Sequence, residues 1–194
     1  MLAQQLEAIA RASRESGAET WVMAPMISTP AEAAEFAGLA RDTGLGTVGV
    51  MVEIPSAALQ AEEILAEVDF VSIGTNDLAQ YAMATDRQAP GLGGLQDPWQ
   101  PAVLRLLGMV GHAGRCAGKP VGVCGEAAAD PALAAVLVGL GVTSLSMALR
   151  ALEPVRRALA RVTVEDCRRA AEAALASGDP AAARESVSRI LSTE

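Results

Sequence analysis

Short, almost continuously apolar runs alternate along the chain with longer segments rich in alanine and leucine. Runs of this kind are typical of strands buried on both faces, and the longer segments have the length of helices. Regular alternation of the two predicts a parallel sheet with right-handed crossover connections. The predicted strands lie at Thr20–Ile27, Thr47–Glu53, Phe70–Gly74, Pro120–Cys124 and Val142–Met147.

Local patterns of polar residues and proline mark the helix starts. Residues 29–32, Thr-Pro-Ala-Glu, combine an N-cap residue, a proline in the first turn and a capping-box glutamate. Residues 163–166 form a second capping box, and the Asp-Pro pairs at 130–131 and 179–180 give the same cap-then-proline order. After Arg150 the pattern predicts helices only, at Val155–Ala160, Val164–Ala176 and Ala181–Leu191.

Two architectures fit this order of elements, a (β/α)8 barrel and an open doubly wound sheet. A barrel needs eight strands, whereas the sequence predicts only the five ranges given above. An open sheet can stop at five strands, so the strand count alone does not decide between the two.

Composition narrows the class of protein. Hydrophobic residues make up 51% of the chain, and a net charge of -8 excludes the basic surface of a nucleic-acid-binding protein. No apolar run is long enough to span a membrane, and the amphipathic start does not have the order of a secretory signal. Cys116, Cys124 and Cys167 are too few and too scattered for a disulfide framework. We therefore expect a soluble, cytoplasmic α/β protein without nucleic-acid or membrane partners.

Polar residues stand at the carboxyl ends of the predicted strands, where parallel α/β folds gather their chemistry. Glu53 closes the second strand, and Asn76 and Asp77 follow the third. Two carboxylates and an amide form a set of oxygen ligands that suits Mg²⁺, which is commonly completed by water and substrate phosphate. Structural alternatives stay open here: Glu53 as a residue of the sheet rim, and Asn76 and Asp77 as caps of the following helix.

Further candidate residues follow the third and fourth strands. Arg87, expected about three turns into the helix after the third strand, offers a bidentate fork for phosphate or carboxylate. Cys124, at the end of the fourth strand, could transfer a proton, although a cysteine in that position is also a common core residue. His112, the only histidine, is expected on the surface of a helix, and Met23 and Met26 in the core of the first strand.

The run DFVSIGTNDLAQYAMATDR, over Asp69–Arg87, resembles the magnesium-site motif of the phosphoenolpyruvate-utilising enzymes and is most similar to enzyme I of the bacterial sugar phosphotransferase system. Relatives of the pyruvate phosphate dikinase and phosphoenolpyruvate synthase type are the alternative within this family. Gln80-Tyr81 and Ala127-Ala128-Ala129 look more like enzyme I. Further blocks that resemble the family in the same order lie at Val22–Ser28, Gly49–Ala57, Asp97–Leu107, Gly122–Pro131 and Leu140–Met147.

The resemblance implies a TIM-type barrel of the phosphoenolpyruvate/pyruvate class. About five of its eight βα units would lie over residues 1–161, followed by a C-terminal helical tail over 162–194 packed on the barrel. It implies that Glu53 and Asp77 ligate Mg²⁺ and that Asn76 and Asp77 contact phosphoenolpyruvate. Arg87 would hold the phosphate of the substrate, and Cys124 would protonate the enolate carbon to give pyruvate.

The family also implies partners and limits. Its members pass the phosphoryl group to a histidine of a separate amino-terminal domain and from there to the histidine phosphocarrier protein, and they dimerise through the C-terminal domain. No residue of this sequence matches that histidine, and two phosphoenolpyruvate-binding arginines of upstream strands are absent. We therefore expect that the chain alone, whether a gene fragment or a genuine short product, cannot complete the transfer. The alternative is a non-catalytic module that binds Mg²⁺ and phosphoenolpyruvate or supports dimerisation.

Overall fold

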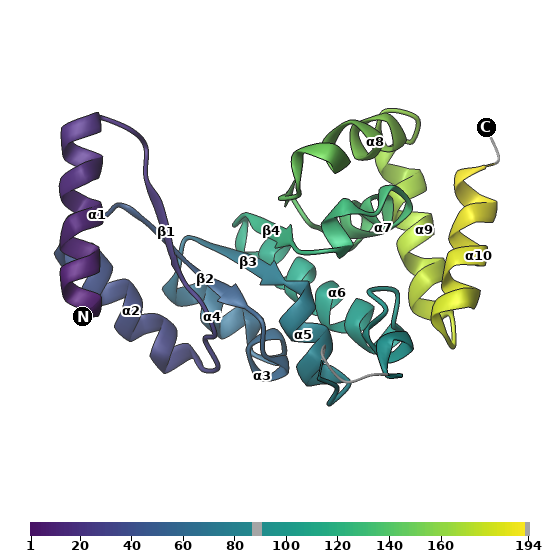
Figure 1. Cartoon of the computed structure of the whole chain (residues 1–194), viewed down its shortest axis with the longest axis horizontal. Coiled ribbons are helices and arrows are strands. Elements are labelled where there is room, and N and C mark those ends of the chain that lie inside the picture. Colours follow the sequence, from purple (N-terminus) through teal and green to yellow (C-terminus); the bar gives the residue numbers. More distant parts are fainter. Residues whose placement is uncertain (87–90, 193–194) are drawn as a thin grey trace.

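The structure is a computed structural model that describes residues 1–86 and 91–192 (Figure 1). Within these ranges, each predicted strand range contains one strand of a five-stranded sheet. Every strand pairs in parallel with the next strand along the chain. The strands are β1 (Trp21–Ala24), β2 (Thr47–Val52), β3 (Phe70–Gly74), β4 (Val121–Cys124) and β5 (Ser144–Leu145).

All four predicted helix starts are confirmed. The Thr29 hydroxyl accepts a hydrogen bond from the Glu32 amide at 3.3 Å, and the Glu32 carboxylate accepts one from the Thr29 amide at 3.2 Å. Asp130 and Asp179 accept hydrogen bonds from first-turn amides of their helices, and Thr163 begins the second capping box.

The helices are α1 (Leu2–Ser16), α2 (Pro30–Asp42), α3 (Pro55–Leu59), α4 (Ala61–Glu67), α5 (Thr75–Ala82), α6 (Pro101–Ala117), α7 (Pro131–Leu140), α8 (Leu149–Leu159), α9 (Val164–Ala176) and α10 (Pro180–Leu191), with 3₁₀ turns at η1 (Gly93–Gln96) and η2 (Ala127–Ala129).

The strand order β1-β2-β3-β4-β5 decides between the two architectures. A doubly wound sheet reverses its strand order, which sends helices to both faces, whereas right-handed crossovers without a reversal place every helix on the same face. The helices contact one another in chain order, α2 with α4, α4 with α6 and α6 with α7. The chain therefore forms successive units of a (β/α) barrel, and the predicted α/β fold, a partial barrel with extra C-terminal helices, is confirmed.

Only one face of the sheet is covered by these helices. Residues paired across parallel strands share a face, and the pair Val50 and Val71 is fully buried on the helix side. On the opposite face, Trp21 is 51% exposed, and its ring lies 4.9 Å from the ring of Phe70. The prediction that the strands are covered on both faces is therefore wrong, because all the helices lie on one face and the five strands do not close around the other face as the eight strands of a complete barrel do.

The expectation that Met23 and Met26 lie in the core of the first strand is also wrong, since both are 42% exposed. Met23 shares the uncovered face with Trp21. Strand β1 ends at Ala24, so Met26 lies in the following loop, where it adopts a positive φ of 58°.

The C-terminal helices pack onto the barrel units. Helix α9 packs against α7, and α10 packs against α9 and also contacts α7. Figure 1 shows α1 at one end of the molecule and α10 at the other, with the strands between them. The division of the chain at residue 161 stays a prediction. In the described part of the chain, no helix is both long and apolar enough to cross a membrane.

The capping box of α9 gives a pH-dependent prediction. Hydrogen bonds from the Thr163 hydroxyl and amide, together with the contact from Arg169, lower the pKa of Asp166 to about 2 from 3.8. The ionised carboxylate therefore stabilises the folded state above about pH 4, and this contribution is lost as the pH falls through about 2. Asp166→Asn should lower the melting temperature at neutral pH, and its difference from the unmodified chain should shrink between pH 4 and pH 2.

Thermal melts across this pH range check the prediction. Glu165→Gln changes a neighbouring, exposed carboxylate in the same turn and serves as the control. A difference between Asp166→Asn and the unmodified chain that stays constant down to pH 2 would contradict the assigned pKa.

Candidate functional site

The predicted site residues that the structure describes lie at one edge of the sheet. Glu53 follows β2 directly, Asn76 and Asp77 lie in the first turn of α5 immediately after β3, and Cys124 is the last residue of β4. The strands are in parallel register, with Gly74 at the end of β3 opposite Cys124. The topology therefore brings these four side chains to the carboxyl ends of three adjacent strands.

Glu53 reaches from the end of its own strand across the end of the next one. Its side chain is buried, with a relative exposure of 7%, and its Oε2 accepts a hydrogen bond from the Met26 amide at 3.0 Å. A Cβ atom at Gly74 would lie 2.6 Å from both Cγ and Oε1 of Glu53. Only a glycine at position 74 leaves room for the carboxylate in this position.

Asn76 is held by the segment that follows β4. Its Oδ1 accepts a hydrogen bond from the Glu126 amide at 3.2 Å, and a Cβ atom at Gly125 would lie 2.8 Å from the same oxygen. Gly125 has a φ of 91°, which favours glycine. The neighbouring Thr75 hydroxyl donates to the Cys124 carbonyl at 2.8 Å. These contacts fix the start of α5 to the end of β4.

Neither Asn76 nor Asp77 occupies the N-cap position of α5. The N-cap position of α5 is Gly74, and both residues lie inside the helix. The Asn76 side chain bonds to the Glu126 amide of another segment. Asp77 is an acidic residue in the first turn, where the helix dipole favours negative charge.

Cys124 is a half-buried thiol that donates to the Ile73 carbonyl at 3.5 Å. Burial raises the pKa of this thiol, and the negative charges of Glu53 and Asp77 raise it further, against a hydrogen bond with Ser72 that lowers it. The thiol is therefore protonated at neutral pH. It shares one electrostatic environment with both carboxylates.

Arg87 lies outside the described residues. Helix α5 ends at Ala82, and residues 83–86 are not helical, so the expectation of one continuous helix running to Arg87 is wrong. Among the residues described, no group of three or more histidine, cysteine, aspartate or glutamate side chains could hold a metal ion. The predicted Mg²⁺ ligands, Glu53 and Asp77, are only two side chains and therefore do not form a group of this size.

Sequence reasoning missed a polar pocket beside Asn76. The pocket has a volume of about 440 Å³ and brings together segments that are distant along the chain. Local pattern carries no signal for it, since Arg184 of α10 bonds to Asp97, 87 positions earlier. Its lining residues are Asn76, Gly93, Gln96, Asp97, Pro98, Glu126 and Arg184.

The model of the family described as "PEP-utilising enzyme, PEP-binding domain" matches residues 1–164. The chain belongs to this family. The resemblance stated from the sequence motifs is therefore confirmed, and the site described above lies inside the matched region.

Two curated relatives are each named phosphoenolpyruvate-protein phosphotransferase. The chain is 51% identical over 195 residues to the phosphoenolpyruvate-protein phosphotransferase of Streptomyces coelicolor, covering 100% of this chain and 35% of the relative. It is 40% identical over 191 residues to that of Geobacillus stearothermophilus, covering 92% of this chain and 32% of the relative. The chain thus spans about a third of the length of these relatives.

Solved structures agree on the fold. A citrate lyase from Burkholderia xenovorans covers 98% of this chain and 67% of its own, with a TM-score of 0.58 and 21% identity. An HpcH/HpaI aldolase/citrate lyase family protein from Burkholderia cenocepacia covers 79% of this chain and 68% of its own, with a TM-score of 0.54 and 25% identity. Both likenesses support the barrel architecture.

The close approach at Gly74 gives a test of the site geometry. Gly74→Ala should displace the Glu53 side chain and destabilise the fold by about 1–3 kcal/mol, the usual cost of overpacking, because its Cβ would lie 2.6 Å from Glu53. Gly38→Ala is the matched control. Gly38 lies in helix α2, and a Cβ atom at this position would have no neighbour within 4 Å. Thermal melts of both variants check this, and equal effects of the two substitutions would contradict it.

Proposed function

We propose that this chain is the phosphoenolpyruvate-binding part of a phosphoenolpyruvate-protein phosphotransferase. In the proposed reaction, phosphoenolpyruvate bound with Mg²⁺ gives its phosphoryl group to a histidine outside this chain, and pyruvate is released. The observation that carries the proposal is the convergence of Glu53, Asn76, Asp77 and Cys124 at the ends of β2, β3 and β4. A relative that is 51% identical to this chain carries this enzyme name.

The donor set fits Mg²⁺. Glu53 and Asp77 would hold the ion, which ordinarily takes one or two carboxylates and fills its other positions with water and substrate phosphate. Two carboxylates are enough for such a site, whereas an all-protein cage would need more ligands. Both carboxylates raise the pKa of Cys124, which supports a common location for the three side chains. When bound, the ion supplies positive charge that offsets the charge on the phosphate and on the enolate oxygen.

Cys124 is proposed as the general acid. Loss of the phosphoryl group from phosphoenolpyruvate leaves the enolate of pyruvate, whose methylene carbon must take up a proton. A thiol with a raised pKa keeps its proton at neutral pH and can give it to that carbon, leaving a thiolate. The Ile73 carbonyl and the hydrogen bond with Ser72 orient the sulfur. Asn76 is proposed to contact the substrate, and Arg87 to hold its phosphate.

The phosphoryl acceptor has to come from outside this chain. The one histidine, His112, is exposed on α6, and its Nε2 lies 3.5 Å from the Cys116 sulfur. The pocket that His112 lines includes none of the predicted site residues. The proposed partner downstream is a histidine phosphocarrier protein. A relative from Rhodobacter capsulatus, 42% identical over 178 residues, is named a multiphosphoryl transfer protein. A homodimer formed through the C-terminal domain, the cytoplasm as location and a role in sugar uptake belong to the same proposal.

Ligand-dependent stabilisation tests the binding part. Mg²⁺ with phosphoenolpyruvate at about 100 times the dissociation constant should stabilise the chain by about 2.7 kcal/mol, which corresponds to a melting temperature about 5–10 °C higher. The double variant Glu53→Gln/Asp77→Asn should lose this shift. Glu62→Gln/Glu63→Gln removes two exposed carboxylates of α4 and should keep it. A shift of equal size in both double variants would place the ligand elsewhere.

Proton exchange tests Cys124 without any phosphoryl acceptor. The chain with Mg²⁺ should exchange the methyl protons of pyruvate with deuterated water, and Cys124→Ala should slow this by about 100-fold or more, the usual range for a lost general acid–base group. Loss of the pyruvate methyl signal in NMR spectra measures the rate. Cys116→Ala changes an exposed cysteine and is the control. Equal rates for Cys124→Ala and the unmodified chain would assign this thiol to packing.

A further inference from the structure

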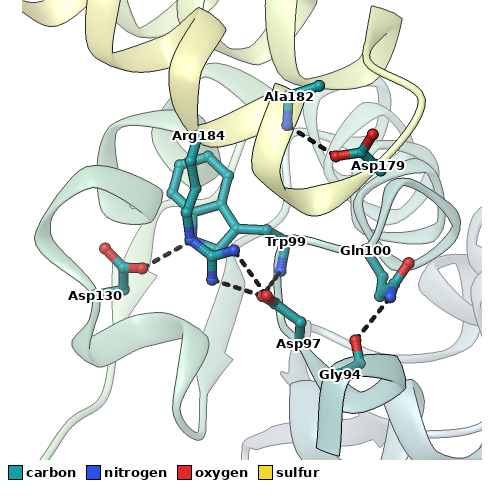
Figure 2. A network of polar contacts seen from close by, with 8 residues as sticks. All are labelled: Gly94, Asp97, Trp99, Gln100, Asp130, Asp179, Ala182 and Arg184. Atoms are coloured by element: carbon teal, nitrogen blue, oxygen red, sulfur yellow. Dashed lines mark hydrogen bonds and ion pairs between the residues drawn. The ribbon is translucent and has the colours of Figure 1, made fainter.

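Helix α10 is tied to the segment that precedes α6 through one arginine (Figure 2). The two terminal nitrogens of Arg184 donate to the two carboxylate oxygens of Asp97, each at 2.7 Å. The guanidinium also lies 5.3 Å from the ring centroid of Trp99. A bidentate pair stacked on an aromatic ring uses the planar geometry that distinguishes arginine from lysine.

The two partners of Arg184, Asp97 and Trp99, make further hydrogen bonds that hold them in place. Asp97 accepts a hydrogen bond from the Trp99 amide at 3.0 Å, and the Trp99 indole, which is 1% exposed, donates to Asp130 at 2.8 Å. Asp130 is the N-cap residue of α7. The cluster of Asp97, Trp99, Asp130 and Arg184 thus joins three elements: α10, the segment before α6, and the start of α7.

Electrostatics favour the charged form of this pair. Burial alone would raise the pKa of Asp97, but the hydrogen bond from Arg184, the Trp99 amide and the Arg184 charge together hold it below its ordinary value. The hydrogen bond to Asp97 raises the pKa of Arg184, against a smaller effect of burial. The pair is therefore fully ionised at neutral pH, and its two hydrogen bonds are charge-assisted.

A short segment, residues 126–130, connects the cluster to the proposed substrate site. Asp130 follows the 3₁₀ turn η2, and Glu126 immediately precedes that turn. The Glu126 amide donates to the Asn76 side chain at 3.2 Å. Asp97 and Arg184 line the same pocket as Asn76 and Glu126. Fixing Asp130 therefore holds one end of the 126–130 segment, and the other end of that segment donates the hydrogen bond that orients Asn76.

We propose that Arg184 is a positioning residue for the phosphoenolpyruvate site: through Asp97, Trp99 and Asp130 it holds the 126–130 segment, and so the Asn76 side chain, in place. This inference rests on the proposed function and goes beyond it, because it makes the C-terminal helix part of the support of the site. Arg184 lies beyond residues 1–164, which the family model matches.

The test compares Arg184→Gln, Arg184→Lys and Asp97→Asn with the unmodified 194-residue chain. The dissociation constant for phosphoenolpyruvate with Mg²⁺ is measured by calorimetry at a temperature well below the melting point of every variant. Hydrogen exchange at the Glu126 amide is followed in the absence of ligand. Arg189→Gln is the matched control, since Arg189 lies on the same helix and pairs with Glu185 one turn earlier at 3.9 Å.

Arg184→Gln and Asp97→Asn should each weaken binding about 3- to 10-fold, which lies within the range for residues that act on a site without touching its ligand. Both should speed exchange at the Glu126 amide. Their combination should weaken binding no further than either alone, because the two act as a unit. Arg184→Lys keeps the charge without the fork and should lie between Arg184→Gln and the unmodified chain. Arg189→Gln should bind normally.

A purely structural role predicts a different result. Arg184→Gln would then lower the melting temperature and leave the dissociation constant unchanged, which overturns the inference while the proposed function stands. Unchanged exchange at Glu126 would overturn it equally. Failure of the unmodified chain to bind phosphoenolpyruvate with Mg²⁺ would instead contradict the proposed function, and the inference with it.

Discussion

Because every strand of this sheet pairs with the next one in sequence and every crossover has the same hand, all the crossover helices lie against one face. The same constraint brings the carboxyl ends of the strands to one edge, so residues separated by long stretches of sequence become neighbours there. It also leaves the second face uncovered by helices, with Trp21 half-exposed beside Phe70. The position of the site and the exposure of that face thus have a single cause.

Close approach to the backbone gives the site its shape. Glu53 crosses the end of β3 over Gly74, and the Asn76 oxygen lies against Gly125, so each polar side chain occupies the space that a Cβ would fill. These contacts place the carboxylate and the amide directly against the backbone. They leave the two negative charges near the Cys124 thiol, whose pKa is raised by burial and by those charges. A protonated thiol in this position supports the proposed role of Cys124 as a general acid.

The C-terminal helices extend the support of this site beyond the barrel units. Helix α9 packs on α7, and α10 carries Arg184 to Asp97 and Trp99. Trp99 in turn bonds to Asp130, the residue that caps α7. One buried aromatic ring therefore connects a helix near the end of the chain to the segment that orients Asn76. The helical tail is coupled to the sheet edge through specific polar contacts as well as through apolar packing.

Features that depend on neighbouring residues could be predicted from the sequence. Branched apolar runs placed the five strands, and the caps at Thr29, Asp130, Thr163 and Asp179 placed the helix starts, because both effects act within one turn or one strand. The common location of the motif residues could also be predicted, because the carboxyl ends of parallel strands lie at the same edge of a sheet. Three features could be seen only in the folded chain: which face of the sheet the helices cover, where the Glu53 side chain lies and which residue Arg184 binds. Those outcomes depend on strand order and on contacts between distant segments, and a local pattern in the sequence carries no information about either.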